Sequence, residues 1–343
     1  MLINLKYKFK KYFSQIKVQY FWIIYILLIS IVTLLFLPSY SIQLELYGKV
    51  TDRSHLLRVQ NVSHYINPHK NTFLTDVPQN YLSYAKLLQA YRSIAVFICS
   101  NVKHRDRRRH IRTTWGRVLR PKPIFILGLS TDNEVDNEMA LEEAHLYQDV
   151  IIENFHESYQ NLTLKTLFAL KHFLRLTPNE TYFLKIDDDV FLNTYQLEHI
   201  MEKYQTTPGI IGHLESQRYA HRDKESKWFT PRWMLSKEAL PNFINGPAYL
   251  ISGSLIKKIY EKALETPLIT LEDVFLTGLV SNELLNIPLY NNIGFEDYYS
   301  IDSIFNRDCF YRSVFTIHRM TLMEQIYELW DKLKENHEPC WDI

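Results

Sequence analysis

Three consecutive aspartates, Asp187, Asp188 and Asp189, interrupt the otherwise apolar stretch TYFLKIDDDVFLN at residues 181–193. Adjacent carboxylates repel one another unless a positive group holds them. One interpretation is purely structural, with one aspartate capping the next helix and the others solvated. A cap needs only one aspartate, however, and carboxylate oxygens on a loop suit Mg²⁺ or Mn²⁺, which such sites share with substrate phosphates. The triplet therefore favours a divalent cation that bridges a diphosphate.

Two further acids and one histidine are candidates for the same chemistry. Glu272 and Asp273 lie in LEDVFLTG at residues 271–278, at the start of a helical pattern. Successive helical residues point about 100° apart, so only one of the two acids can face a cleft. Thr270 and Asp273 also fit a capping box, which is the structural alternative. His318 ends a short β-like run, SVFTIHRM, where a lone histidine is more often structural than a ligand.

A basic segment, RRRHIRTTWG at residues 107–116, supplies candidate anion-binding groups. Arg108 and Arg112 are four residues apart and fall on one face of a predicted helix. Like charges in this arrangement are unfavourable unless an anion lies between them. A solvated basic face is the alternative interpretation.

The elements that must position these residues follow an alternating pattern from residue 93 onward. Strands are predicted over 93–99, 123–129, 149–155, 181–187 and 209–214, and helices over about 106–115, 133–146, 162–176 and 194–204. This alternation of apolar strands and helices predicts an α/β domain with a mostly parallel sheet covered on both faces. Ligands bind such sheets beyond the carboxyl ends of the strands, where the aspartate triplet lies. After residue 215 the pattern becomes an irregular, basic and aromatic stretch (221–245), followed by predicted helices at 252–266, 272–285 and 321–335.

An uncharged run from Phe21 to Leu37 is long enough to cross a bilayer. The preceding residues carry lysines and no acid, which places the N-terminus in the cytosol. We therefore expect a cytosolic tail (1–19), a transmembrane signal-anchor (20–37), a lumenal stem (38–91) and a globular domain (92–343). A cleaved signal peptide is the alternative, but the run lacks a small-residue exit site.

Composition adds three expectations. The formal net charge of +1 gives no reason to expect a nucleic-acid partner. A lumenal domain predicts glycosylation, and N-x-S/T sequons begin at Asn61, Asn161 and Asn179. Cys99 lies in an apolar run and is expected in the core, while Cys309 and Cys340 could pair in an oxidising lumen.

Taken together, these motifs resemble the β-1,3-galactosyltransferase family, glycosyltransferase family 31, whose members share a GT-A fold. The matching segments occur in the family's order: RRRHIRTTWG, FILG (125–128), ESYQNLTLKT (157–166), KIDDDVF (185–191), KWFTPRW (227–233), NGPAYLIS (245–252), EDVFLTG (272–278) and HRM (318–320). The chain departs from the family at Leu240-Pro241-Asn242-Phe243, where a Tyr-Pro-x-Tyr is usual, and at Ala248, which replaces a glycine. These departures bear on substrate identity more than on activity.

The resemblance implies an inverting transfer of a hexose, galactose in the first instance, from a UDP-sugar to an acceptor glycan in β-1,3 linkage. Asp273 would be the general base, with Glu272 as the fallback. Asp189 and His318 would bind Mn²⁺, with Mg²⁺ as the second choice, and the metal would stabilise the departing diphosphate.

The resemblance assigns further positions to the two substrates. Asp187 and Asp188 would contact the ribose, the donor sugar or metal-bound water. The nucleotide end is expected at Arg108, Arg112 and Lys165, and sugar contacts are expected at Trp228, Trp233, Gly246 and Tyr249. Core packing is the alternative for both tryptophans. The implied partners are a UDP-hexose and an oligosaccharide on a glycoprotein or glycolipid, and the implied location is the Golgi membrane, in a type II single-pass orientation.

Three other functions are weighed against this one. A β-1,3-N-acetylglucosaminyl- or N-acetylgalactosaminyltransferase of the same family would differ only in the donor. A glycosidase would use two carboxylates that flank the scissile bond, whereas a contiguous triplet suits a metal. A catalytically inactive, membrane-anchored sugar-binding protein could keep the fold, although the intact acids and His318 argue against it.

Overall fold

The computed structural model of the chain describes residues 60–78, 94–177, 182–204, 206–296 and 310–336. The predicted membrane segment, Asn179, Cys309 and Cys340 lie outside these ranges. Within them, no helix has both the length and the apolar character needed to cross a bilayer.

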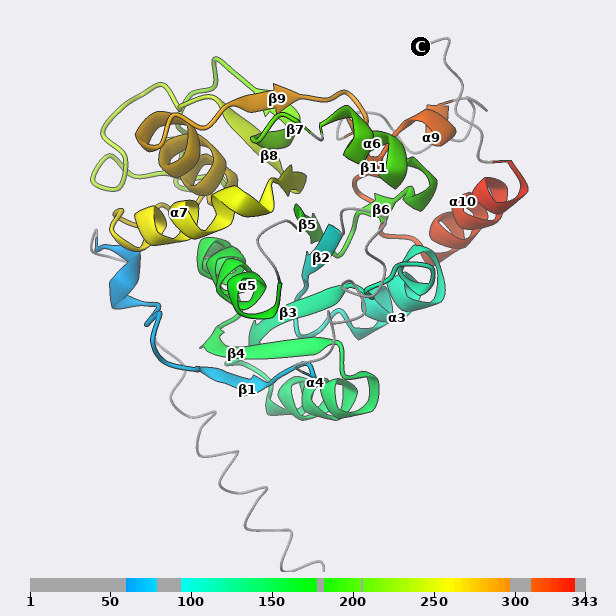
Figure 1. The fold of residues 1–343 in the computed structure, drawn as a ribbon. Helices are drawn as coiled ribbons and strands as arrows, with labels where there is room; N and C mark the ends of the chain where they lie inside the picture. The colour runs from blue at the N-terminus through cyan, green and yellow to red at the C-terminus, as the bar shows by residue number, and fades with distance from the viewer. Residues whose placement is uncertain (1–59, 79–93, 178–181, 205, 297–309, 337–343) are drawn as a thin grey trace, which may run out of the picture. The chain divides into compact units, whose positions relative to one another are not determined.

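An eight-stranded mixed sheet forms the centre of the domain, in the order β1-β4-β3-β2-β5-β8-β7-β9 (Figure 1). Its strands are β1 (Phe73–Thr75), β2 (Ile94–Cys99), β3 (Ile124–Leu129), β4 (Val150–His156), β5 (Tyr182–Asp187), β7 (Ile210–Glu215), β8 (Phe243–Ile251) and β9 (Leu289–Asn291). Strands β4, β3, β2 and β5 run parallel to one another, and β9 runs parallel to β7. Strand β1 pairs antiparallel with β4, and β8 pairs antiparallel with both β5 and β7. The predicted α/β sheet is confirmed but is mixed, with parallel strands at its centre and antiparallel pairings at β1 and β8. All five predicted strands lie within one residue of the observed bounds.

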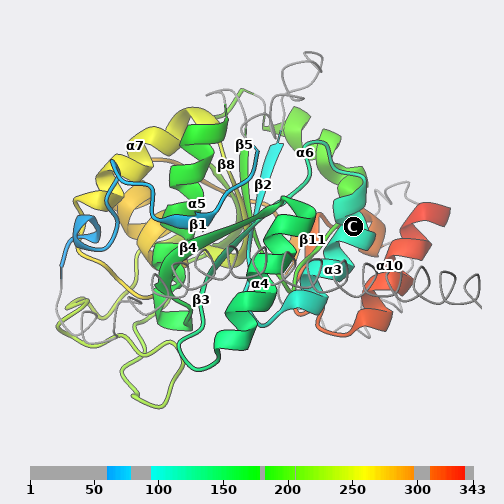
Figure 2. The same ribbon diagram turned by 90° about the horizontal axis from the view of Figure 1, so that it is seen from below.

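Helices cover both faces of this sheet. The α-helices are α3 (Arg105–Thr113), α4 (Glu134–Tyr147), α5 (Leu162–Leu176), α6 (Leu197–Lys203), α7 (Gly253–Leu264), α9 (Phe310–Ser313) and α10 (Met323–Glu335). Short 3₁₀ turns are η2 (Val62–His64), η3 (Trp115–Arg117), η4 (Tyr159–Asn161) and η5 (Thr194–Gln196). Figure 2 shows α5 and α7 on one side of the sheet and α3 and α4 on the other. This two-sided cover explains why every residue of β2 and β3 is buried.

The core is rich in aromatic side chains between the sheet and α5. The ring of Phe97 lies 6.2 Å from that of Phe173 and 5.3 Å from that of Phe183, measured between centroids. All three side chains are buried. Such contacts add to the free energy gained by burying apolar area and hold β5 rigidly against its neighbours.

A second, three-stranded sheet brings distant parts of the chain to the end of β5. Its strands are β10 (Phe295–Glu296), β11 (Thr316–Ile317) and β6 (Phe191–Leu192). Strand β6 follows the aspartate triplet, and β11 pairs antiparallel with it and immediately precedes His318. The backbone N–H of Met320 also donates to the carbonyl oxygen of Asp189, at 2.8 Å. This small sheet therefore places His318 beside the triplet.

Three features differ from the predictions. Strand β8 was not expected, because its first residues fall in the stretch read as irregular (221–245) and no element was predicted over 246–251; the strand forms with a register shift against β7. The segment 272–285 is helical as expected, but η6 (Val274–Leu284) is a π-helix. Residues 60–78 fall in the expected stem, yet β1 pairs with β4 and Val62 is fully buried. The expected domain boundary at residue 92 is therefore too late.

Candidate active site

The aspartate triplet lies at the C-terminal end of β5, and each carboxylate has its own basic partner. Lys185 Nζ donates to Asp187 Oδ1 at 2.5 Å, and Arg107 donates to Asp188 Oδ1 at 2.8 Å. His318 Nε2 lies 3.5 Å from Asp189 Oδ1. The positive charge that adjacent carboxylates require is thus supplied largely by side chains of this domain.

Asp188 is the most completely bound of the three. Its Oδ1 accepts from Arg107, and its Oδ2 lies at hydrogen-bond distance from the Ser100 hydroxyl, the Asn101 N–H and the His104 imidazole, at 2.8–3.2 Å. Although burial opposes ionisation, the hydrogen bonds from His104, Arg107 and Ser100 lower the pKa of Asp188 to about 2. Both carboxylate oxygens of Asp188 are thus bound by groups of the domain, which hold the loop in place, and the expected contact to the donor stays a prediction.

A buried network lies behind Asp187. Lys185 is fully buried, and its Nζ also donates to the carbonyl oxygen of Gly246 at 2.5 Å and lies 3.9 Å from Glu272 Oε2. The Tyr249 hydroxyl donates to Glu272 Oε1 at 2.5 Å. Burial raises the pKa of Glu272 to about 7, and Lys185 opposes that rise. Glu272 thus faces inward, as one of the two neighbouring acids must.

Asp273 is the acid that faces outward. Its side chain is half-buried, its Oδ1 accepts from the Val274 N–H at 2.8 Å and its Oδ2 from the Gly246 N–H at 3.1 Å. A Cβ at position 246 would lie 3.2 Å from Asp273 Oδ2, which is why a glycine suits this position. Burial raises the pKa of Asp273, while the two N–H groups and Lys185 oppose the rise. The alternative of a Thr270–Asp273 capping box is not what the hydrogen bonds of these two residues show: the Thr270 hydroxyl donates to the sulfur of Met234 at 3.6 Å, and the Asp273 carboxylate itself caps η6 through the Val274 N–H.

The donor atoms at the end of β5 fit a divalent cation in part. Asp189 and His318 offer a hard oxygen and an imidazole nitrogen, which suit Mn²⁺. Their 3.5 Å separation shows that one ion could contact both side chains. Within the described residues no group of three or more His, Cys, Asp or Glu side chains forms a cage. Two protein ligands fit an ion that shares a diphosphate with the substrate better than a resident structural metal.

The two arginines predicted to face the nucleotide are bound within the domain. Arg108 is fully buried, and its five N–H groups are used by Glu143, Ser100 and the carbonyl oxygens of two loop residues, Asn101 and Val102. Arg112 forms ion pairs with Glu143 at 2.6 Å and with Asp149 at 2.7 Å. The anion required between the arginines is therefore Glu143, and the arginine beside the aspartates is Arg107.

Two more predicted substrate contacts prove to be buried. Lys165 donates to Glu157 at 2.6 Å and to the carbonyl oxygen of Ser100 at 2.7 Å. Tyr249 has no exposed surface, so its side chain supports Glu272 from behind instead of touching a sugar. The sequon residue Asn161 is likewise buried, and its Nδ2 donates to the His156 carbonyl oxygen at 2.9 Å.

The two tryptophans are exposed, which excludes core packing. Trp228 and Trp233 expose 45% and 48% of their surface. Lys227 Nζ lies 4.6 Å from the Trp228 ring centroid and 6.0 Å from that of Tyr159. The carboxylates of Asp273, Asp187 and Glu272 contribute to the raised pKa of Tyr159, after burial. Tyr159 is therefore close enough to these acids for their charge to act on its hydroxyl, and Lys227 contacts both its ring and that of Trp228.

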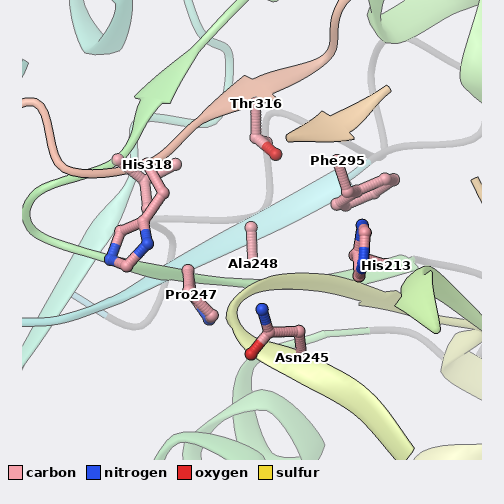
Figure 3. A pocket seen from close by; sticks show the side chains of 8 residues that line it. His213, Asn245, Pro247, Ala248, Phe295, Thr316 and His318 are labelled. Carbon is pink, nitrogen blue, oxygen red and sulfur yellow. The ribbon is translucent and has the colours of Figure 1, made fainter. Parts of the chain in front are cut away.

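A pocket opens beside His318 (Figure 3). It is lined from both sheets, by Val190, His213, Asn245, Pro247, Ala248, Phe295, Thr316 and His318. Figure 3 shows His318 at one end and His213 and Asn245 toward the other. The polar ends of these side chains alternate with the apolar surfaces of Pro247, Ala248 and Phe295, a mixture that suits the two faces of a sugar ring.

Lys185, His104 and Arg107 were not identified from the sequence as site residues. A signal for Lys185 was present, because a lysine inside the apolar strand YFLKID must have buried partners. Its side chain lies on the same face of β5 as Asp187, two residues on. No comparable signal marked His104 or Arg107, since only the fold brings α3 and its preceding loop to β5.

Comparison with known proteins identifies the family. The galactosyltransferase family pattern matches residues 106–292. Human β-1,3-galactosyltransferase 1 is 31% identical over 284 residues, which cover 80% of this chain and 82% of that protein. Human β-1,3-galactosyltransferase 2 is 30% identical over 246 residues, 68% of this chain and 57% of that one. A mannosyltransferase structure from Pyrobaculum calidifontis aligns at a TM-score of only 0.36 and 10% identity, covering 66% of this chain and 59% of its own. On the sequence matches, the chain belongs to the galactosyltransferase family, glycosyltransferase family 31.

Proposed function

We propose that this protein is an inverting, Mn²⁺-dependent β-1,3-galactosyltransferase of the GT-A type that uses UDP-galactose. The single observation that carries the proposal is Asp273. It is a half-buried carboxylate with both oxygens held by backbone N–H groups, and it lies in the EDV segment of a chain shown to belong to the family. It is connected to the aspartate triplet through Gly246 and Lys185.

Asp273 would act as the general base. An acceptor hydroxyl is a weak nucleophile, so a carboxylate must take its proton as the new glycosidic bond forms. Burial raises the pKa of Asp273 and makes the carboxylate a stronger base, while the N–H groups of Gly246 and Val274 keep its orientation fixed. Glu272 cannot reach an acceptor as easily, because it is buried against Tyr249.

Asp189 and His318 would hold the Mn²⁺ that comes with the nucleotide-sugar. When bound, the metal supplies a Lewis acid for the negative charge that develops on the departing UDP. Arg107 and His104 keep Asp188 ionised and so fix the loop from which Asp189 projects. Asp187, the carboxylate bound to Lys185, would contact the donor substrate.

The sugar contacts are assigned from the exposed surfaces. The pocket beside His318 combines imidazole and amide groups with apolar surfaces, a polarity that would suit contact with a sugar. Trp228 and Trp233 would stack on the acceptor, because both expose ring surface. Lys227 contacts the rings of both Trp228 and Tyr159. Residues 20–37 would anchor the domain in the Golgi membrane with the active site in the lumen.

The test uses the full-length protein in detergent with a panel of UDP-sugars and acceptor glycans, scored by UDP release. We expect UDP-galactose to be used with Mn²⁺ and activity to be lost with a chelator. Asp273→Asn should reduce kcat by at least about 100-fold and leave UDP binding intact, because the base is needed only in the chemical step. Asp189→Ala should weaken UDP–Mn²⁺ binding itself.

Glu272→Gln is the matched control for the base. It changes the neighbouring acid by the same one atom and should retain far more activity than Asp273→Asn. If Glu272→Gln lost more activity than Asp273→Asn, Glu272 would be the general base. Absence of UDP–Mn²⁺ binding at millimolar concentration would contradict the proposal as a whole, and preference for a UDP-N-acetylhexosamine would move the protein to another donor class in the same family.

A further inference from the structure

Gly246 occupies a gap in the hydrogen bonding of β8. The β5–β8 ladder ends at the Ile186–Ala248 pair, and the β7–β8 ladder skips from Tyr249 to Ile244. Gly246 therefore has a regular partner on neither neighbouring strand. Its two backbone groups are used otherwise: the N–H donates to Asp273 and the carbonyl oxygen accepts from Lys185.

Lys185 donates two hydrogen bonds, to Asp187 Oδ1 and to the Gly246 carbonyl oxygen, both at 2.5 Å. Glu272 Oε2, at 3.9 Å, adds an ion-pair contact but accepts no hydrogen bond from the ammonium group. Burying this charge is costly, and its partners offset that cost only with close geometry. An ion pair with Asp187 would by itself balance the charge of Lys185. The additional hydrogen bond to the Gly246 carbonyl oxygen ties Lys185 to the residue whose N–H holds Asp273, which points to a second role.

We propose that Lys185 is a positioning residue for the reaction, because its ammonium group anchors the Gly246 backbone so that the Gly246 N–H orients Asp273. The proposal builds on the proposed function, since it takes Asp273 to be the base. It adds that one side chain fixes both ends of the site, Asp187 on the donor side and Asp273 on the acceptor side. A base displaced by about 1 Å can cost about 100-fold in rate.

The alternative is that Lys185 only balances buried negative charge. Both roles predict that Lys185→Met destabilises the fold, so stability cannot separate them. The roles differ at Asp273, whose pKa Lys185 lowers and whose charge in turn raises the pKa values of Glu272 and Tyr159. A positioning role requires that the Gly246–Asp273 hydrogen bond change when Lys185 is removed.

The sequence offers a direct probe of that hydrogen bond. Among the nine glycines of the chain, only Gly246 follows an asparagine. Labelling with ¹³C-carbonyl asparagine and ¹⁵N-glycine therefore selects the single peptide bond between Asn245 and Gly246. Its amide resonance is followed against pH in the full-length protein in detergent, with neither donor nor metal present.

In the wild type, the Gly246 amide resonance should titrate with Asp273. In Lys185→Met, a purely electrostatic role of the lysine would raise the midpoint but keep the amide proton shift of the high-pH form, in which Asp273 is ionised. A positioning role requires in addition that this high-pH resonance move upfield, because the Gly246–Asp273 hydrogen bond is weakened or lost. The kcat should also fall by about 100-fold, and the acid limb of the kcat/KM profile should move to higher pH. The matched control is Lys165→Met, which removes another buried lysine bound to one carboxylate and one carbonyl oxygen. It should leave the Gly246 midpoint in place.

A Gly246 amide resonance that keeps its wild-type position at high pH in Lys185→Met, or that moves equally in Lys165→Met, would overturn the proposal. If the wild type transferred no sugar, the proposed function would fail, yet the resonance would still decide whether Lys185 orients Asp273.

Discussion

At the scale of single residues, two adjacent acids have been given opposite environments. Glu272 is buried against Tyr249 and close to Lys185, while Asp273 faces outward between two backbone N–H groups. One residue along a helix is enough for this, because the side chains diverge by about 100°. The chemistry of the site therefore depends on which acid the helix turns toward the substrate.

The raised pKa of Glu272 has a consequence for stability. Its pKa rises from 4.5 to about 7 on folding, so the fold favours the protonated form. That contribution to the free energy of unfolding is complete below pH 4.5 and is lost as pH rises through about 7. At 1.36 kcal/mol per pKa unit the loss is about 3 kcal/mol. Urea denaturation at several pH values should show this slope in the wild type and not in Glu272→Gln.

The exposed Glu142 provides the control for that measurement. Glu142→Gln should keep the pH dependence of the wild type. If Glu272→Gln kept it as well, Glu272 would be ionised in the fold at neutral pH, and Lys185 would be its full counter-charge.

At the scale of elements, α3 carries residues toward two different sites. Arg107 points to the aspartate triplet, whereas Arg108 and Arg112 tie α3 to Glu143 on α4 and to Asp149 at the start of β4. Arg112 also stacks on the Tyr147 ring at 4.1 Å. Helix α3 is thus held at a fixed position against the sheet, and this position directs Arg107 toward Asp188.

Arg108→Met tests this division of roles. Breaking one side of a buried ion pair costs about 3–5 kcal/mol, so the free energy of unfolding should fall by that amount. The affinity for UDP should be unchanged at a temperature where the variant is folded. Arg109→Met, at the exposed neighbouring position, should stay within about 0.5 kcal/mol of the wild type. If Arg108→Met kept normal stability but lost UDP binding, Arg108 would instead contact the nucleotide.

At the scale of the whole molecule, the domain begins earlier than its composition suggests. Val62, Ile66 and Val77 belong to the hydrophobic core, and Lys171 on α5 donates to the carbonyl oxygen of Asn67 at 3.0 Å. We therefore expect truncation at residue 92 to destabilise the domain, although residues 38–91 read as a polar linker.

Glycosylation gives a test of the lumenal orientation. Asn61 is half-buried and its side chain makes no capping hydrogen bond, whereas Asn161 is buried with its Nδ2 bound to His156. Expressed in a secretory system, the full-length protein should lose a glycan, seen as a shift in gel mobility, on Asn61→Gln. Asn161→Gln should cause no such shift. A glycan at Asn161 would require the α5 entrance to open, and absence of all glycans would argue against a lumenal domain.

The sequence by itself determined the strand–helix alternation, the location of the aspartate triplet and the family, because these depend on local periodicity and contiguous motifs. The tertiary structure decided which charges meet. His318 reaches Asp189 through the pairing of β6 with β11, and Gly246 reaches Asp273 through a strand that local propensity did not reveal. The partners of Arg108 and Lys185 were equally beyond the sequence, since the pairing of a buried charge is set by contacts between residues far apart in the chain.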